Sequence, residues 1–223
     1  MNRIARLTLA AGLLAGILLP AAQAQDATSS QTKLAKQLDR VDFSLSGMGL
    51  FNGTVSGTVP NNGTQYSGQT VTETGSNTAG LLSTIRYTMK PYFGIEYNAT
   101  YARFTETFNI APYQVQSGVT EQTFGYVVTP RQKFFGLQPI ISAGAGSTRF
   151  KPTRGGGQAV AVQWRATYYY NVGVQKELGD SHFGVRLSMR QAFFKAPDFL
   201  MNYLTINKRT SSFEPNLGIY VRF

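Results

Sequence analysis

Charged residues at alternate positions are the part of this sequence with the clearest chemistry. Arg86 precedes Glu96 by ten residues, and a three-residue turn at Lys90-Pro91-Tyr92 would place the two side chains opposite each other on antiparallel strands. Such a pair either fills an interior or lines a narrow gated path. By the parity of the strands described below, the charges expected to face the interior are Asp42, Arg86, Glu96, Glu121, Arg165, Arg186, Arg190 and Arg222.

Residue types needed for catalysis or metal binding are scarce. His182 is the only histidine and there is no cysteine, so a multi-histidine or thiolate metal site is excluded. The run Gly155-Gly156-Gly157 lacks the Gly-Lys-Ser/Thr ending of a phosphate-binding loop. His182 also lies beside an expected turn, away from the end where a lipid-modifying site would need it. We therefore expect no enzyme, no metal and no cofactor.

The elements that position the interior charges are β-strands, because apolar and polar residues alternate along most of the chain after residue 40. In the clearest segment Val162 and Trp164 have one parity, whereas Gln163 and Arg165 have the other. The segments with this pattern are 42–51, 79–89, 91–103, 119–129, 134–149, 159–178, 182–194 and 210–223.

An even number of strands and alternating connection lengths predict a closed barrel. The short connections lie around 90–91, 130–133 and 179–180, and the long ones at 52–78, 104–118, 150–158 and 195–209. We predict an all-β protein: an eight-stranded antiparallel up-and-down transmembrane β-barrel with short periplasmic turns and longer extracellular loops. A two-residue turn at Gly179-Asp180 would pair Gln175 with Gly184.

The N-terminal residues 1–24 have the features of a secretory signal peptide. Arg3 and Arg6 precede an apolar run, and Ala22-Gln23-Ala24 fits the cleavage rule. We expect residues 25–40 to form a periplasmic N-terminal segment and residues 41–223 the barrel domain. Charged residues make up only 14% of the chain, against roughly 25% in an ordinary globular protein. No later apolar run reaches the ~18 residues of a membrane-spanning helix.

Without the two arginines of the signal, the net charge is about +8. Nucleic acid is not an expected partner, because the basic residues are scattered and the protein is expected to be exported. Anionic lipid headgroups fit better, so we expect charge matching to the phosphates of lipopolysaccharide. The alternative is an external ligand that contacts the 52–78 loop. The basic outer rim would comprise Arg103, Arg149, Lys151, Arg154, Lys195, Lys208 and Arg209.

The C-terminal strand carries the residues of a family signature. Asn216, Gly218, Val221 and Phe223 fall at the polar, glycine, apolar and terminal aromatic positions, although Val221 stands where an aromatic residue is common. In this ending, and in its architecture from residue 41 to 223, the chain resembles the small OmpA/OmpX-type outer-membrane β-barrel family. The resemblance implies location in the bacterial outer membrane and recognition by the outer-membrane assembly machinery.

Three functions are compatible with these features. We favour a structural or surface-interaction protein, because an eight-stranded barrel is only wide enough for its own side chains to fill the lumen. The first alternative is a narrow gated pore or a carrier of a small apolar molecule. With five inward arginines against three acids, such a pore would favour anions. The second is a lipid-modifying enzyme, for which no acid, base and nucleophile are found at the outer rim.

Overall fold

The computed structural model describes residues 37–61, 63–90, 92–179 and 182–223. The chain divides into two units, Met1–Gln37 and Leu38–Phe223, and the second contains all the strands of the described residues. The expected signal peptide, and the expected periplasmic segment up to residue 36, lie outside the described residues. Among the described residues, no helix is long and apolar enough to cross a membrane.

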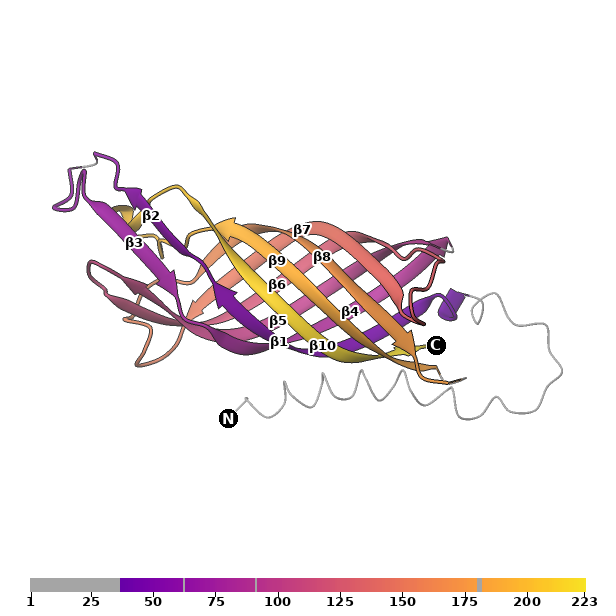
Figure 1. Ribbon diagram of the computed structural model, residues 1–223. Coiled ribbons are helices and arrows are strands. Elements are labelled where there is room, and N and C mark those ends of the chain that lie inside the picture. The colour runs from indigo at the N-terminus through magenta and orange to yellow at the C-terminus, as the bar shows by residue number, and fades with distance from the viewer. Residues whose placement is uncertain (1–36, 62, 91, 180–181) are drawn as a thin grey trace. The chain divides into compact units, whose positions relative to one another are not determined.

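Eight antiparallel strands close into a barrel (Figure 1), as the alternation predicted. Their order around the barrel is β5-β4-β1-β10-β9-β8-β7-β6, and the pairing of β5 with β6 completes the circle. Neighbours in sequence are neighbours in space, so the topology is up-and-down. The eight strands are β1 (Val41–Asn52), β4 (Thr78–Lys90), β5 (Phe93–Phe108), β6 (Gln114–Val128), β7 (Gln138–Pro152), β8 (Gln163–Glu177), β9 (Phe183–Lys195) and β10 (Arg209–Arg222).

The segment 52–78 is not the loop that we expected, because it folds as a hairpin of β2 (Thr54–Thr58) and β3 (Thr70–Gly75). The hairpin continues beyond the barrel, and β3 pairs with the end of β5 (Figure 1). Cross-strand hydroxyl bonds such as Thr54 to Thr74 hold its outer face together. We call the end of the barrel with this hairpin the loop end, and the end with the C-terminus the turn end.

The prediction of a loop at 104–118 is also wrong, because β5 runs to Phe108 and β6 begins at Gln114. Alternation does continue here, but with reversed polarity. Phe104 and Phe108 point inward and are buried, whereas Arg103 points outward and is exposed. The predicted strand therefore ended at residue 103, because apolar residues were expected only on the outward face.

The strand register confirms one turn and corrects another. Arg86 lies opposite Glu96, as the three-residue turn predicted. At the β8–β9 connection, however, Gln175 lies opposite Arg186 rather than Gly184. The connection is longer than a two-residue turn, and the error of two positions preserves which residues face inward, because the side-chain period is two.

Three other connections differ from expectation. The β6–β7 connection covers residues 129–137 rather than 130–133, and the β7–β8 connection covers 153–162. The segment 196–208, expected as an extracellular loop, contains a short 3-10 helix, η2 (Asn202–Leu204). Phe199 and Leu204 of this segment are each only 1% exposed. The segment therefore turns inward and covers the loop end.

The interior has two layers with different chemistry. Polar and charged side chains fill the half near the turn end, and an apolar core fills the half near the loop end. In that core, Phe150 packs against Phe104 and Phe194, and Phe199 packs against Phe108. Other core members are Met48, Leu50, Val55, Val71, Val115, Val119 and Ile206.

Candidate functional site

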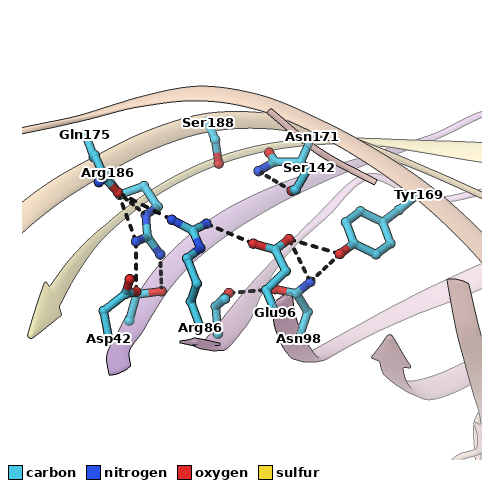
Figure 2. Close-up of polar contacts among 12 residues, drawn as sticks. Asp42, Arg86, Glu96, Asn98, Ser142, Tyr169, Asn171, Gln175, Arg186 and Ser188 are labelled. Carbon is cyan, nitrogen blue, oxygen red and sulfur yellow. Dashed lines mark hydrogen bonds and ion pairs between the residues drawn. The ribbon is translucent and has the colours of Figure 1, made fainter. Parts of the chain in front are cut away.

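The interior near the turn end contains a network of ion pairs (Figure 2). Arg86 Nη2 lies 2.8 Å from Glu96 Oε2, and Arg186 Nη2 lies 2.9 Å from Asp42 Oδ1. Gln175 Oε1 accepts hydrogen bonds from both guanidinium groups and so links the two pairs. The network connects β1, β4, β5, β8 and β9, five of the eight barrel strands.

The Glu96 carboxylate is also held from across the lumen. Its Oε1 accepts hydrogen bonds from the Tyr169 hydroxyl at 2.9 Å and from Asn98 Nδ2 at 3.2 Å. Thr84 in turn donates to Asn98 Oδ1 at 2.7 Å. Tyr169 lies on β8, and the strands β6 and β7 separate β8 from β5. This bond therefore spans the interior rather than joining neighbouring strands (Figure 2).

A second cluster is centred on Arg190 of β9. Its guanidinium contacts Glu214 on the adjacent β10 and Glu121 on β6, across the barrel. The same group lies 4.5 Å from the centroid of the Tyr169 ring. Arg190 is 2% exposed, and its two carboxylate partners are 4% exposed. One cation therefore joins three strands in the middle of the barrel.

The structure brings six of the eight expected interior charges together: Asp42, Arg86, Glu96, Glu121, Arg186 and Arg190. The other two lie elsewhere. Arg222 pairs with Glu177 at 2.6 Å at the turn end, where both side chains are about two-fifths exposed. Arg165 pairs with Asp198 at 2.9 Å beneath the segment 196–208.

Sequence reasoning missed several interior residues. Glu214 has the same parity as Asn216 and could have been found in that way. Tyr169 has the same parity as Arg165 and could have been found in the same way. Glu73 and Glu106 were placed in loops that are in fact strands. Because Glu73, Glu106, Asp198 and Glu214 are all buried, the expected excess of inward arginines over acids is wrong, and so is the anion preference based on it.

The buried acids at the loop end lie in an unusual environment. Glu106 is 1% exposed and Glu73 is 4% exposed. Burial raises the pKa of Glu73 to about 8, against the nearby positive charge of Arg165. Burial, and then the charge of Glu73, raise the pKa of Glu106 well above its ordinary value. The two carboxyl groups therefore favour the protonated form in the folded protein.

Two small cavities lie among the interior side chains. A cavity of about 10 Å³ lies among residues that include Arg86, Glu96 and Arg186, and one of about 20 Å³ lies near Phe104 and Glu121. A cavity must offer roughly 10–15 Å³ to hold one water molecule. Each space therefore has room for about one water.

The seven expected rim cations all lie toward the loop end, but five of them are on strands rather than in loops. Arg103 is on β5, Arg149 and Lys151 are on β7, Lys195 is on β9 and Arg209 is on β10. Only Arg154 and Lys208 lie in connections. In the part of the chain that the structure describes, none of the seven forms an ion pair.

The terminal strand closes the barrel against β1. Leu217 and Ile219 face outward, whereas Asn216 is buried and accepts a hydrogen bond from Ser188 at 2.7 Å. Gly218 lies between Ser46 and Arg186 in the register, and a Cβ atom there would lie 2.1 Å from Ser46 Oγ. Gly218 therefore makes room in the packed interior. Val221 pairs with Phe43, and the Phe223 amide donates to the Val41 carbonyl at the rim of the turn end.

His182, the histidine considered for catalysis, lies away from the loop end. His182 is exposed at the turn end, where its carbonyl accepts a hydrogen bond from the Arg222 amide. Within the described ranges, no three His, Cys, Asp or Glu side chains are arranged to hold a metal ion.

Comparison with known proteins identifies the fold. No protein-family model and no curated protein sequence matches the chain. Among solved structures, the outer membrane protein OprG from Pseudomonas aeruginosa superposes with a TM-score of 0.54 at 15% identity, covering 82% of this chain and 95% of OprG. Neisserial surface protein A covers 81% of this chain and 97% of its own length at 13% identity, with a TM-score of 0.49.

An identity of 15% to OprG establishes the fold and not the activity. The barrel closure, the strand number and this superposition agree with each other. The chain therefore has the fold of the small, eight-stranded OmpA/OmpX-type outer-membrane β-barrels.

Proposed function

We propose that this chain is an integral outer-membrane protein with a side-chain-plugged lumen and a structural or surface-interaction role. The turn end lies in the periplasm and the loop end outside the cell. An exposed apolar belt around the barrel supports this placement, because such a surface is stable only against lipid. Members of the belt are between 43% and 68% exposed and include Leu45, Leu81, Ile85, Ile95, Phe124, Tyr126, Ile141, Val172, Leu187, Met189, Leu217 and Ile219.

Aromatic residues mark the two edges of the belt, where Trp and Tyr prefer the membrane–water interface. Tyr101 and Trp164 lie toward the loop end, and Phe183 and Phe223 toward the turn end. In the proposed placement, the hairpin of β2 and β3 with Glu73, and the end of β5 with Glu106, lie beyond the outer edge of the membrane.

The observation that carries the plugged lumen is its closure at two successive levels. The network around Glu96 and Arg190 fills the membrane-spanning interior, and the apolar core beneath the segment 196–208 fills the interior beyond it. Removing one partner from a buried ion pair costs about 3–5 kcal/mol, so spontaneous opening of the network is rare. We therefore propose that the protein acts through its outer surface, without conduction or catalytic turnover.

Three proposed partners follow from this placement. Lipopolysaccharide is the proposed partner of the basic outer rim, and an unidentified external ligand is compatible with the β2–β3 hairpin. The outer-membrane assembly machinery is the proposed partner of Asn216, Gly218, Val221 and Phe223. Deleting Phe223 should lower the outer-membrane yield while export continues, and an unchanged yield would contradict the assembly role.

The placement and the plug can be tested together. Cell fractionation should recover the protein in the outer membrane, and the purified barrel should migrate differently on gels before and after boiling. Proteoliposomes that contain it should not swell in solutions of a small sugar. Recovery from the soluble periplasmic fraction would contradict the placement, and swelling would contradict the plug.

One observation favours the carrier alternative. An apolar groove of about 490 Å³ lies on the barrel wall, lined by residues that include Tyr97, Phe124, Tyr126 and Ala145. In the proposed placement this groove faces lipid, so acyl chains would fill it. Specific retention of one apolar compound by purified protein, lost on Ala145→Leu, would favour the carrier function instead.

A further inference from the structure

Two cations from different strands flank a glycine on the outward face at the loop end. Arg103 of β5 and Lys151 of β7 both lie opposite Gly118 of β6. Two strand spacings separate them by about 10 Å, so both long side chains can reach a single group between them. A Cβ atom at Gly118 would meet nothing closer than 3.8 Å, the nearest atoms being the Lys151 carbonyl oxygen and the Tyr101 hydroxyl. The space between the two cations is therefore open.

Aromatic side chains lie on the belt side of this space. Arg149, the next outward residue of β7 toward the belt, lies opposite Trp164, and its guanidinium carbon is 5.5 Å from the centroid of the indole ring. Tyr101 and Arg149 both lie opposite Thr120. On the other side, Arg103 donates a hydrogen bond to Gln116 Oε1. The three cations thus lie between the aromatic edge of the belt and the polar loop end.

A second pair of outward cations lies on β9 and β10, beyond β8. Lys195 and Arg209 lie directly opposite each other on β9 and β10. Like charges in that position destabilise a sheet unless a counter-ion neutralises them. The Arg209 guanidinium carbon lies 5.4 Å from the centroid of the Tyr168 ring, so this pair also lies against an aromatic side chain of β8.

In the part of the chain that the structure describes, no acidic residue at the loop end faces outward to balance these charges. Among the described residues, the acids toward the loop end, Glu73, Glu106, Glu121, Asp198 and Glu214, are all 8% exposed or less. The described acids that are exposed, Asp39 and Glu177, lie at the turn end. The acids are turned inward and the bases outward, so the rim needs an anion from outside the chain.

We propose that Arg103, Arg149 and Lys151 form a binding site for a phosphate group of a lipid with a phosphorylated sugar headgroup in the outer leaflet, with Lys195 and Arg209 as a second contact. This inference rests on the proposed outer-membrane placement. Bound there, the phosphate lies between Arg103 and Lys151 above Gly118, and the acyl chains extend along the apolar belt below Trp164. The position of the cations directly beside the belt favours a lipid over a free anion, because only a lipid uses both surfaces.

The test compares two double variants in detergent micelles with diphosphorylated lipid A as the probe. Arg103→Gln/Lys151→Gln removes two exposed cations and leaves the contact of Arg149 with Trp164. Arg131→Gln/Lys133→Gln is the matched control, since Arg131 also lies over an aromatic ring, that of Tyr92, but at the turn end. The loss of two charge-assisted contacts should weaken binding about tenfold or more in the first variant, and the control should bind like the wild type.

Two further arms identify the source of the phosphate and separate this inference from the proposed function. Lipid A without phosphate should bind weakly, and inorganic phosphate at the same concentration should not compete. Equal binding by the two double variants, or full competition by inorganic phosphate, would overturn the lipid site. Outer-membrane fractionation of the wild type is measured alongside, so that a failed placement is distinguished from a failed site.

Discussion

Tyr169 donates a hydrogen bond to Glu96 across the barrel at 2.9 Å, although their strands, β8 and β5, are not neighbours. Because the same carboxylate pairs with Arg86, one acid joins both sides of the lumen. A bond of this kind exists only when the interior is closed at that level.

Replacing Glu96 with Gln should destabilise the barrel, because it leaves the buried Arg86 guanidinium without its carboxylate. We expect a loss of about 3 kcal/mol or more in the free energy of unfolding, measured by urea titration in vesicles. Glu177→Gln is the control, since its pair with Arg222 is about two-fifths exposed and should contribute about 1 kcal/mol or less. Equal effects of the two substitutions would show that the network contributes no special stability.

Removing Arg190 should lower the free energy of unfolding more than removing either of its partners. Arg190→Met leaves Glu121 and Glu214 buried together without a cation. Adding Glu121→Gln and Glu214→Gln to this variant should restore part of the lost stability, because two uncompensated buried charges disappear. If the stability losses of the three substitutions simply add, without rescue, the three charges are not energetically coupled.

Stability of the loop end should fall as the pH rises. In the proposed placement Glu73 lies beyond the membrane. It faces Arg165, Glu106 and Asp198, and burial raises its pKa from 4.5 to about 8. A raised carboxyl pKa means that the folded state binds a proton that the unfolded state has released. Its contribution is therefore present below pH 4.5 and is lost progressively between pH 4.5 and about 8, by up to about 1.4 kcal/mol per pH unit.

Protease resistance of the β2–β3 hairpin at pH 5 and pH 9 measures this effect. Glu73→Gln should remove much of the pH dependence and protect the hairpin at pH 9. Asp39→Asn, which changes an exposed acid at the turn end, should alter neither value. Greater resistance of the wild type at pH 9 than at pH 5 would contradict the assignment.

Phe199 should anchor the segment that covers the loop end. It is 1% exposed, packs against Phe108, and its amide donates to Gln163 Oε1 at 3.0 Å. Phe199→Ala should cost about 3–5 kcal/mol locally and expose the segment 196–208 to protease on intact cells. Leu200→Ala, at an exposed neighbouring position, is the control. Cleavage at the same rate in both variants would contradict an anchoring role for Phe199.

The alternation of residues was enough to predict the eight strands, the closure and the inward face of most charges. It succeeded where one face is apolar and the other polar, as around Trp164 and Arg165. It failed beyond the belt, where Phe104 and Phe108 point inward and the polarity is reversed. The hairpin of β2 and β3 is rich in Thr and Ser on its outer face, so it resembled a loop in composition.

The partners of the interior charges were harder to predict than their orientation. Arg86 and Glu96 are close in sequence and joined by one turn, so their pairing followed from the register. Glu121 and Arg190 meet across the lumen, and no local pattern encodes such a contact. The same holds for Arg165 with Asp198, which depends on how the segment 196–208 folds inward.

Single-channel recording on purified protein in planar lipid bilayers tests the plugged lumen most directly. The wild type should give no reproducible conductance steps. As long as the barrel stays folded, Glu96→Gln and Glu177→Gln should give none either. Reproducible steps in the wild type that change in size with Glu96→Gln, and not with Glu177→Gln, would show that ions pass Glu96 and would contradict a closed interior.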